Sequence, residues 1–117
     1  MHELSLMSEL VEQAEELAHK EKFDRVYEIR VAVGALSGVD PSCLEFCFPE
    51  AIQDSVLKGA KLVLEFIGIE LECHACHSLS HPPYPDSALS LTCHKCQSGD
   101  VRVSKGREFT IAEMEVA

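Results

Sequence analysis

CHAC at residues 73–76 and CHKC at residues 93–96 are two C-x-x-C pairs separated by sixteen residues. That spacing lies within the range of four-cysteine zinc sites. Two residues between cysteines permit a tight turn that directs both sulfurs at one ion, and two such turns complete a tetrahedron of soft thiolates that suits zinc. Because four ligands close the coordination shell, the pattern predicts a structural zinc site formed by Cys73, Cys76, Cys93 and Cys96.

Other interpretations of this segment remain open. A thiol redox centre needs one C-x-x-C at the start of a helix in a strand-helix-strand unit, and two symmetric pairs joined by a polar loop do not match that arrangement. His74, His77 and His94 lie beside the pairs and offer replacements for a cysteine ligand. We expect them instead to be hydrogen-bonding neighbours or solvated residues, because four thiolates already satisfy the metal.

The remaining two cysteines lie in a more apolar context. Cys43 and Cys47 are four residues apart among Leu44, Phe46 and Phe48. Free cysteine is among the most buried residue types. We therefore expect both to be small buried residues on the inner side of a helix, with a ligand or disulfide role as the alternative.

Composition and charge narrow the class of protein. The chain has 117 residues, of which 46% are apolar and 26% charged, close to the averages of one globular domain. Its net charge of −10 opposes binding to a phosphate backbone, so nucleic acid is not an expected partner. No apolar run approaches the ~20 residues that cross a bilayer, and the glutamates of the first thirty residues are unlike a secretory signal. We expect a cytoplasmic protein, where thiols stay reduced.

Hydrophobic periodicity predicts the first elements. From Leu4 to Ala18 apolar residues recur at three-and-four spacing, which is typical of an amphipathic helix. Residues 27–33 alternate as in a strand with one buried face. Asp40 and Pro41 then supply the N-cap and the first residue of a second helix. This capping role explains Asp40 without a bound metal.

The later elements follow from composition. Pro49 should kink or restart the second helix. Residues 62–71 predict a strand buried largely on both faces, with a bulge at Gly68, and short strands are expected on either side of Gly106. We expect an α+β fold with two helices packed on a small mixed β-sheet and the cysteine segment inserted as a zinc-ribbon-like domain.

The amino terminus carries a second, weaker metal signal. Met1, His2 and Glu3 place a terminal amine, backbone amide nitrogens and an imidazole in adjacent positions. Nitrogen-rich square-planar sites suit Ni(II) or Cu(II). On these residues alone, a disordered terminal histidine is the commoner interpretation.

MHELS at residues 1–5, VGALSGVDP at residues 33–41 and the two cysteine pairs together resemble the HypA/HybF family of nickel chaperones for [NiFe]-hydrogenase maturation. The similarity extends from end to end. The opening motif combined with two C-x-x-C pairs is specific, whereas the cysteines alone match many zinc ribbons. The resemblance implies a nickel-binding α+β domain at residues 1–70 and 103–117 and a zinc-binding domain at residues 71–102.

The resemblance also implies roles for individual residues. His2 would supply the principal nickel ligand, Met1 its amine, and Glu3 its backbone nitrogen or carboxylate, while the four cysteines match the zinc ligands. The implied function is a non-enzymatic metallochaperone that delivers transferable Ni(II) and carries structural Zn(II). A HypB-type nickel-handling GTPase and the hydrogenase large-subunit precursor are the implied partners, with a urease as an alternative acceptor and a homo-oligomer as a possible assembly.

Two other classes of function are alternatives to a metal carrier. A zinc-ribbon interaction module without transferable metal would still work with a blocked amino terminus. An enzyme is disfavoured, because the sequence has no Ser-His-Asp set, Gly-rich phosphate loop or open-site zinc pattern.

Overall fold

The computed structural model describes residues 2–83 and 91–117, without the side chain of His2. The chain divides into two compact units. The helical unit comprises Met1–Ala32, Val39–Glu65 and Thr110–Ala117, and the cysteine unit comprises Val33–Gly38 and Phe66–Phe109. The elements in chain order are α1 (His2–Glu21), β1 (Val26–Gly34), α2 (Pro41–Ala51), β2 (Lys61–Ile67), β3 (Glu70–Cys73), β4 (Leu79–Ser80), β5 (Val101–Lys105) and β6 (Phe109–Val116).

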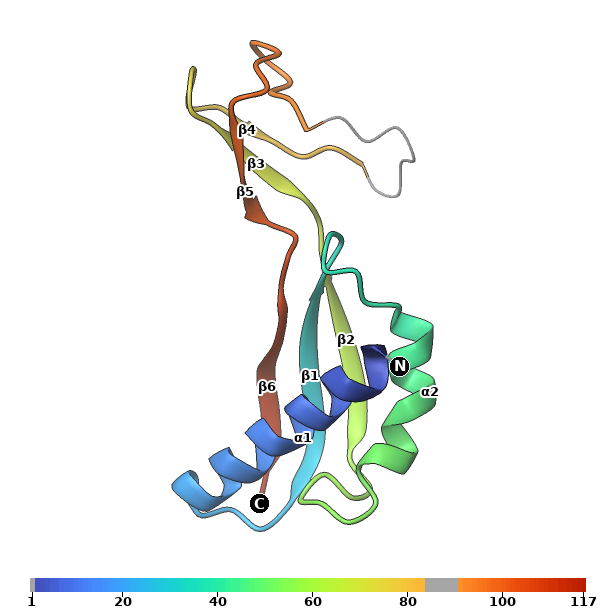
Figure 1. Cartoon of the computed structure of the whole chain (residues 1–117). Coiled ribbons are helices and arrows are strands. Elements are labelled where there is room, and N and C mark those ends of the chain that lie inside the picture. Colours follow the sequence, from blue (N-terminus) through green and yellow to red (C-terminus); the bar gives the residue numbers. More distant parts are fainter. Residues whose placement is uncertain (1, 84–90) are drawn as a thin grey trace. The chain divides into compact units, whose positions relative to one another are not determined.

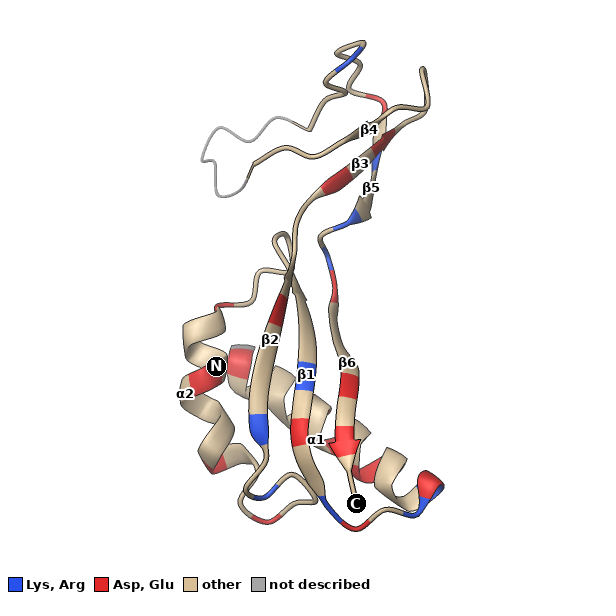
Figure 2. Ribbon diagram, turned by 180° about the vertical axis from the view of Figure 1, so that it is seen from behind, with Lys and Arg blue, Asp and Glu red and all other residues tan. Residues whose placement is uncertain are grey.

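The helix α1 contains the whole predicted stretch from Leu4 to Ala18 and begins two residues earlier, at His2. It lies across one face of a three-stranded sheet in the order β2-β1-β6 (Figure 1). Met7, Leu10 and Ala14 are its buried stripe, and Ile29 and Val31 of β1 are buried with them. The view from behind shows the strands in front of α1 (Figure 2). Burial of these apolar side chains is the main stabilising term of the helical unit.

The helix α2 connects β1 to β2, which run in the same direction, while β6 runs in the opposite direction (Figure 1). The sheet is therefore mixed and carries two helices, as expected. Asp40 caps α2, since its Oδ1 accepts the backbone N–H of Ser42 at 2.9 Å, and Pro41 is the first helical residue. The helix does not restart at Pro49 but continues through it to Ala51. Pro49 lies in the last turn of α2. Its missing N–H removes one helical hydrogen bond, and little of the helix follows it.

The strand predicted over residues 62–71 is wrong in extent and in burial. Two strands occupy it, β2 ending at Ile67 and β3 starting at Glu70, and they belong to different sheets. Most of β2 is half-buried or exposed, and Phe66 is 64% exposed. The apolar composition of residues 62–71 thus comes from two short strands with Gly68 between them, of which only β3 alternates between buried and half-buried residues.

The cysteine unit has its own antiparallel sheet in the order β4-β3-β5. Leu71 at its centre is fully buried and pairs with Ser80 on one side and Val103 on the other. Cys73 pairs with Val101 at the end of β3. The strand β4 had no sequence signal that we identified, because two residues are too few to show a period.

Two glycines permit a close backbone approach in the cysteine unit. The N–H of Gly34 donates to the carbonyl of Glu108 at 2.7 Å, and that of Leu36 donates to Gly106 at 2.6 Å. A Cβ on Gly34 would collide with the backbone of Gly106 and lie 2.7 Å from the nitrogen of Arg107. Gly106 has a φ of +122°, which only glycine adopts readily.

Among the described residues, no helix has the length and apolarity needed to span a membrane.

Candidate metal centre

The first cysteine pair forms a tight turn at the end of β3. The N–H of His77 donates to the carbonyl of Cys73 at 3.0 Å, and the N–H of Cys73 donates to the carbonyl of Ser78 at 3.1 Å. His77 completes this turn with a φ of 64°. The N–H of Cys76 points at the sulfur of Cys73, with a separation of 3.4 Å. These backbone hydrogen bonds and the contact of the Cys76 N–H with the Cys73 sulfur define the positions of both cysteines in the turn.

The second pair repeats this geometry almost contact for contact. The N–H of Gln97 donates to the carbonyl of Cys93 at 2.9 Å, and the N–H of Cys93 donates to the carbonyl of Ser98 at 2.9 Å. Gln97 has a φ of 63°. The N–H groups of Lys95 and Cys96 each lie 3.4 Å from the sulfur of Cys93. The repeated sequence C-H-x-C-x-S thus encodes two equivalent turns, and we call them the first and the second knuckle.

The two knuckles bring four sulfurs together. The sulfurs of Cys73 and Cys96 are 3.6 Å apart, those of Cys76 and Cys93 are 3.5 Å apart, and all four lie within 4.8 Å of one another. A tetrahedral zinc with Zn–S bonds of about 2.3 Å requires sulfurs about 3.8 Å apart. Among the described residues this is the group of metal-ligating side chains that converges on one point. The donor set and its spacing fit a closed four-thiolate metal site.

Hydrogen bonding favours the thiolate form of two of the four cysteines, Cys93 and Cys76. Cys73 and Cys93 are each 1% exposed. The Cys96 N–H, aided by that of Lys95, lowers the pKa of Cys93 to about 6 although burial opposes the shift. A hydrogen bond from the Ser78 side chain lowers the pKa of Cys76. Thiolates bind metal, so these donors favour the form that a dication needs at Cys93 and Cys76. At Cys96 the backbone N–H of Ser98 also lowers the pKa, but the hydrogen bond with Cys73, burial and the other two cysteines outweigh it and raise the pKa to about 12.

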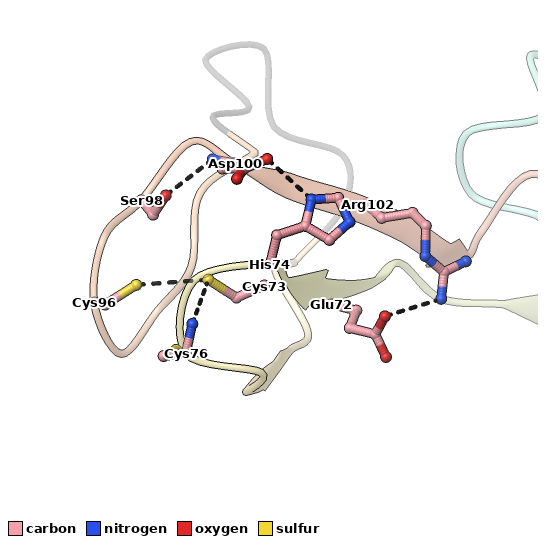
Figure 3. Close-up of polar contacts among 8 residues, drawn as sticks. All are labelled: Glu72, Cys73, His74, Cys76, Cys96, Ser98, Asp100 and Arg102. Carbon is pink, nitrogen blue, oxygen red and sulfur yellow. Dashed lines mark hydrogen bonds and ion pairs between the residues drawn. The ribbon is translucent and has the colours of Figure 1, made fainter.

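Polar side chains surround the knuckles, and three of their contacts were not foreseen from the sequence. Nδ1 of His74 lies 2.9 Å from Oδ1 of Asp100, and Arg102 donates to Glu72 at 3.1 Å (Figure 3). The hydroxyl of Ser80 contacts His94. The expectation that histidines near the cysteines are hydrogen-bonding neighbours is confirmed for His74 and His94. For Asp100 and Ser80 the sequence offered no periodic or motif signal.

The amino-terminal candidate site is only partly within the described residues. Met1 and the side chain of His2 lie outside them, while Glu3 lies in the first turn of α1. Oε2 of Glu3 accepts the backbone N–H of Asp40 at 3.4 Å. This contact places the start of α1 beside the start of α2, within the helical unit.

The expectation for Cys43 is wrong, and that for Cys47 is confirmed. Cys47 is 7% exposed on the inner side of α2, whereas Cys43 is exposed. The Cys43 thiol donates to Oδ2 of Asp40 at 3.5 Å. This hydrogen bond, together with burial and the charge of Asp40, raises the pKa of Cys43. Because the apolar face of α2 is narrow, a residue one turn before Cys47 already lies at its margin.

Comparison with known proteins gives a consistent result. The family model described as "Hydrogenase/urease nickel incorporation, metallochaperone, hypA" matches residues 1–116. Hydrogenase maturation factors HypA of Methylocella silvestris and Geobacter metallireducens are 33% and 34% identical over 116 residues, which is 99% of this chain and of each relative. The solution structure of the Ni metallochaperone HypA from Helicobacter pylori matches with a TM-score of 0.73 and 30% identity, over 97% of this chain and 96% of that one.

The agreement extends over sequence and fold. A second solution structure, of a HypA protein, covers 100% of this chain and 97% of its own with a TM-score of 0.75 and 30% identity. The family model alone spans both units and both metal-site candidates. The resemblance seen in the opening motif and the cysteine pairs is therefore confirmed. The chain belongs to the HypA family, whose members are hydrogenase maturation factors and metallochaperones and not enzymes.

Proposed function

We propose that this protein binds Ni(II) at its amino terminus and delivers it for the maturation of [NiFe]-hydrogenase. His2 supplies an imidazole nitrogen, Met1 its amine, and Glu3 a backbone nitrogen or its carboxylate. The observation that carries the proposal is the match of a nickel-incorporation family over residues 1–116, a range that includes the opening motif. Nickel is cargo in this proposal: it binds, travels and leaves by ligand exchange.

Features of α1 support this nickel site. The helix begins at His2, so the backbone N–H groups of His2 and Glu3 have no acceptor within the helix. Backbone nitrogens next to the terminal amine can thus release their protons to solvent and bind Ni(II) without breaking a helical hydrogen bond. The carboxylate of Glu3 is already engaged with the N–H of Asp40, which favours the backbone nitrogen as the contribution of Glu3. A set of nitrogen donors suits Ni(II).

For the cysteine unit we propose a resident Zn(II) held by Cys73, Cys76, Cys93 and Cys96. Four converging sulfurs with hydrogen-bond donors aimed at them support this assignment. Zinc supplies folding free energy to a segment with few buried apolar side chains. We propose residues 71–102 as the zinc-binding domain and residues 1–70 with 103–117 as the nickel-binding domain.

The proposal includes partners and a compartment. The acceptor of the nickel is a HypB-type nickel-handling GTPase, and the hydrogenase large-subunit precursor is the final destination. Reduced thiols are required for the zinc site, and the cytoplasm maintains them.

Nickel stoichiometry of two matched histidine variants tests the nickel site. His2→Ala removes the proposed ligand, and His19→Ala removes the other histidine of α1, an exposed residue in its last turn. Equilibrium dialysis should give one Ni(II) per chain for the wild type and for His19→Ala, and far less for His2→Ala, while zinc content stays the same in all three. Stoichiometric nickel with unchanged affinity in His2→Ala would contradict the proposal.

A further inference from the structure

Ser80 is a buried polar residue, 4% exposed, in a unit whose other polar side chains are mostly accessible. It ends β4, where its backbone pairs with Leu71, two residues before the first zinc-ligand candidate Cys73. Its hydroxyl contacts His94 of the second knuckle twice, at the backbone nitrogen (3.0 Å) and at the ring Nδ1 (2.7 Å). One hydroxyl therefore ties the strand pair that carries the first knuckle to the second knuckle.

The directions of these two hydrogen bonds follow from the groups involved. A backbone N–H can only donate, so the Ser80 oxygen accepts from the nitrogen of His94. The hydroxyl proton is then free to donate to Nδ1, and 2.7 Å is the usual length of a bond with an O–H donor. In a neutral imidazole with Nδ1 as acceptor, the hydrogen is on Nε2. Neither ring nitrogen of His94 then has a free lone pair.

The equivalent histidine of the first knuckle is held in the opposite way. Nδ1 of His74 lies 2.9 Å from the carboxylate of Asp100, which accepts and does not donate when ionised. The hydrogen of a neutral His74 is therefore on Nδ1, and its lone pair is on Nε2. The two histidines follow equivalent cysteines, so the contrast comes from their partners and not from their places in the knuckles.

We propose that Ser80 is a positioning residue that keeps His94 out of the metal's coordination shell and holds the site as four thiolates. This inference rests on the zinc assignment proposed above. Imidazole is a good zinc ligand, and three cysteines with one histidine form an ordinary structural zinc site. His94 is covalently next to Cys93, so it is the nitrogen donor best placed to replace a sulfur of that knuckle. Ser80 prevents the exchange by occupying Nδ1 and by fixing the backbone from which the ring extends.

Loss of the Ser80 hydroxyl has two consequences. The N–H of His94 loses its acceptor beside the knuckle, which loosens the Cys93 turn. Nδ1 of His94 gains a free lone pair, which lets the imidazole compete for zinc. Partners that orient metal ligands in this way typically change metal affinity by about 10- to 100-fold when removed.

The test uses the full-length, zinc-loaded protein and four variants. Ser80→Ala removes the hydroxyl, and Ser80→Thr retains it. Ser98→Ala is the matched control, because Ser98 also accepts a backbone N–H, that of Asp100 at 3.0 Å, without touching His94. The double variant Ser80→Ala/His94→Ala removes the competing imidazole. The measurements are the ¹⁵N-detected tautomer of His94, the zinc K-edge absorption spectrum, and the rate of zinc transfer to a chromophoric chelator.

The expected results are specific to the hydroxyl. Wild type, Ser80→Thr and Ser98→Ala should show four sulfurs around zinc, with the His94 hydrogen on Nε2 and the His74 hydrogen on Nδ1. Ser80→Ala should show nitrogen in the zinc shell and zinc transfer about 10- to 100-fold faster. The double variant should lose that nitrogen signal.

Several results would overturn the inference. A wild-type His94 with its hydrogen on Nδ1 would overturn the inference, because Ser80 could not then donate to that nitrogen. This result needs no variant, so it applies even if Ser80→Ala fails to fold. Four sulfurs and unchanged zinc transfer in Ser80→Ala would overturn this inference alone and leave the zinc assignment standing. A wild-type spectrum without four sulfurs would overturn the zinc assignment and this inference together.

Discussion

Replacement of Asp40 tests how the start of α2 is stabilised beside the amino-terminal site. Oδ1 of Asp40 accepts the N–H of Ser42 at 2.9 Å, and Oδ2 accepts the thiol of Cys43 at 3.5 Å. Loss of an N-cap side chain costs about 1 kcal/mol, within a range of about 0.5–2 kcal/mol. The carboxylate charge at the positive end of the helix adds about 0.3–1 kcal/mol. Asp40→Ala should therefore lower the free energy of unfolding by about 1.5 kcal/mol.

Asp40→Asn separates the two contributions. The amide oxygen retains the cap on Ser42, so the variant loses the charge contribution and the long hydrogen bond from the Cys43 thiol. The expected destabilisation is about 0.5 kcal/mol. The backbone N–H that reaches Glu3 remains in both variants. Urea denaturation monitored by the helical circular dichroism signal measures both differences. Equal losses in Asp40→Asn and Asp40→Ala, or no loss in Asp40→Ala, would refute the capping argument.

Three further predictions concern the zinc site, a carboxylate and the charge of the surface. Cys93→Ser should abolish stoichiometric zinc binding and destabilise the cysteine unit. The circular dichroism of α1 and α2 should stay largely unchanged, because both helices belong to the other unit, and loss of the helical signal would contradict this prediction. Hydrogen bonds from Ser104 and His81, helped by the charge of Lys105, lower the pKa of Glu70 below its ordinary 4.5. A carboxyl whose pKa is lower in the folded than in the unfolded state stabilises the fold at pH values above its unfolded pKa. Glu70→Gln should therefore be less stable than wild type at pH 7, and urea titrations should show this difference in stability shrinking as the pH falls below about 4.5. A difference that stays constant with pH would contradict the prediction. With a net charge of −10, association with a basic patch on the partner GTPase should weaken between low and high salt in calorimetry, and unchanged affinity would exclude an electrostatic contribution.

The sequence predicted those parts of the fold that depend on local chemistry. Helical spacing of apolar residues from Leu4 to Ala18 located α1, and Asp40 with Pro41 located the start of α2. The C-x-x-C pairs located both knuckles, because two turns of this length direct their sulfurs to one point. In each case the signal lies within a few consecutive residues.

The failures concern features that depend on partners distant in the sequence. The apolar run at residues 62–71 cannot reveal that its two halves pair with different neighbours, β1 for one and β5 for the other. The exposure of Cys43 depends on how far the packing of α2 extends around the helix. Ser80 meets His94 across fourteen positions of sequence, and no periodicity or motif connects them.

The nickel content of protein with an authentic, free Met1 tests the central claim most directly. It should be compared with the same chain extended by two residues before Met1, which converts the terminal amine to an amide and retains every side chain. The amine and the imidazole must both be unprotonated to bind metal, so nickel affinity should fall as the pH is lowered. The authentic protein should bind one Ni(II) per chain and the extended protein should bind nickel far more weakly, with equal zinc in both. Equal nickel stoichiometry and affinity in the two proteins would contradict a carrier site at the amino terminus.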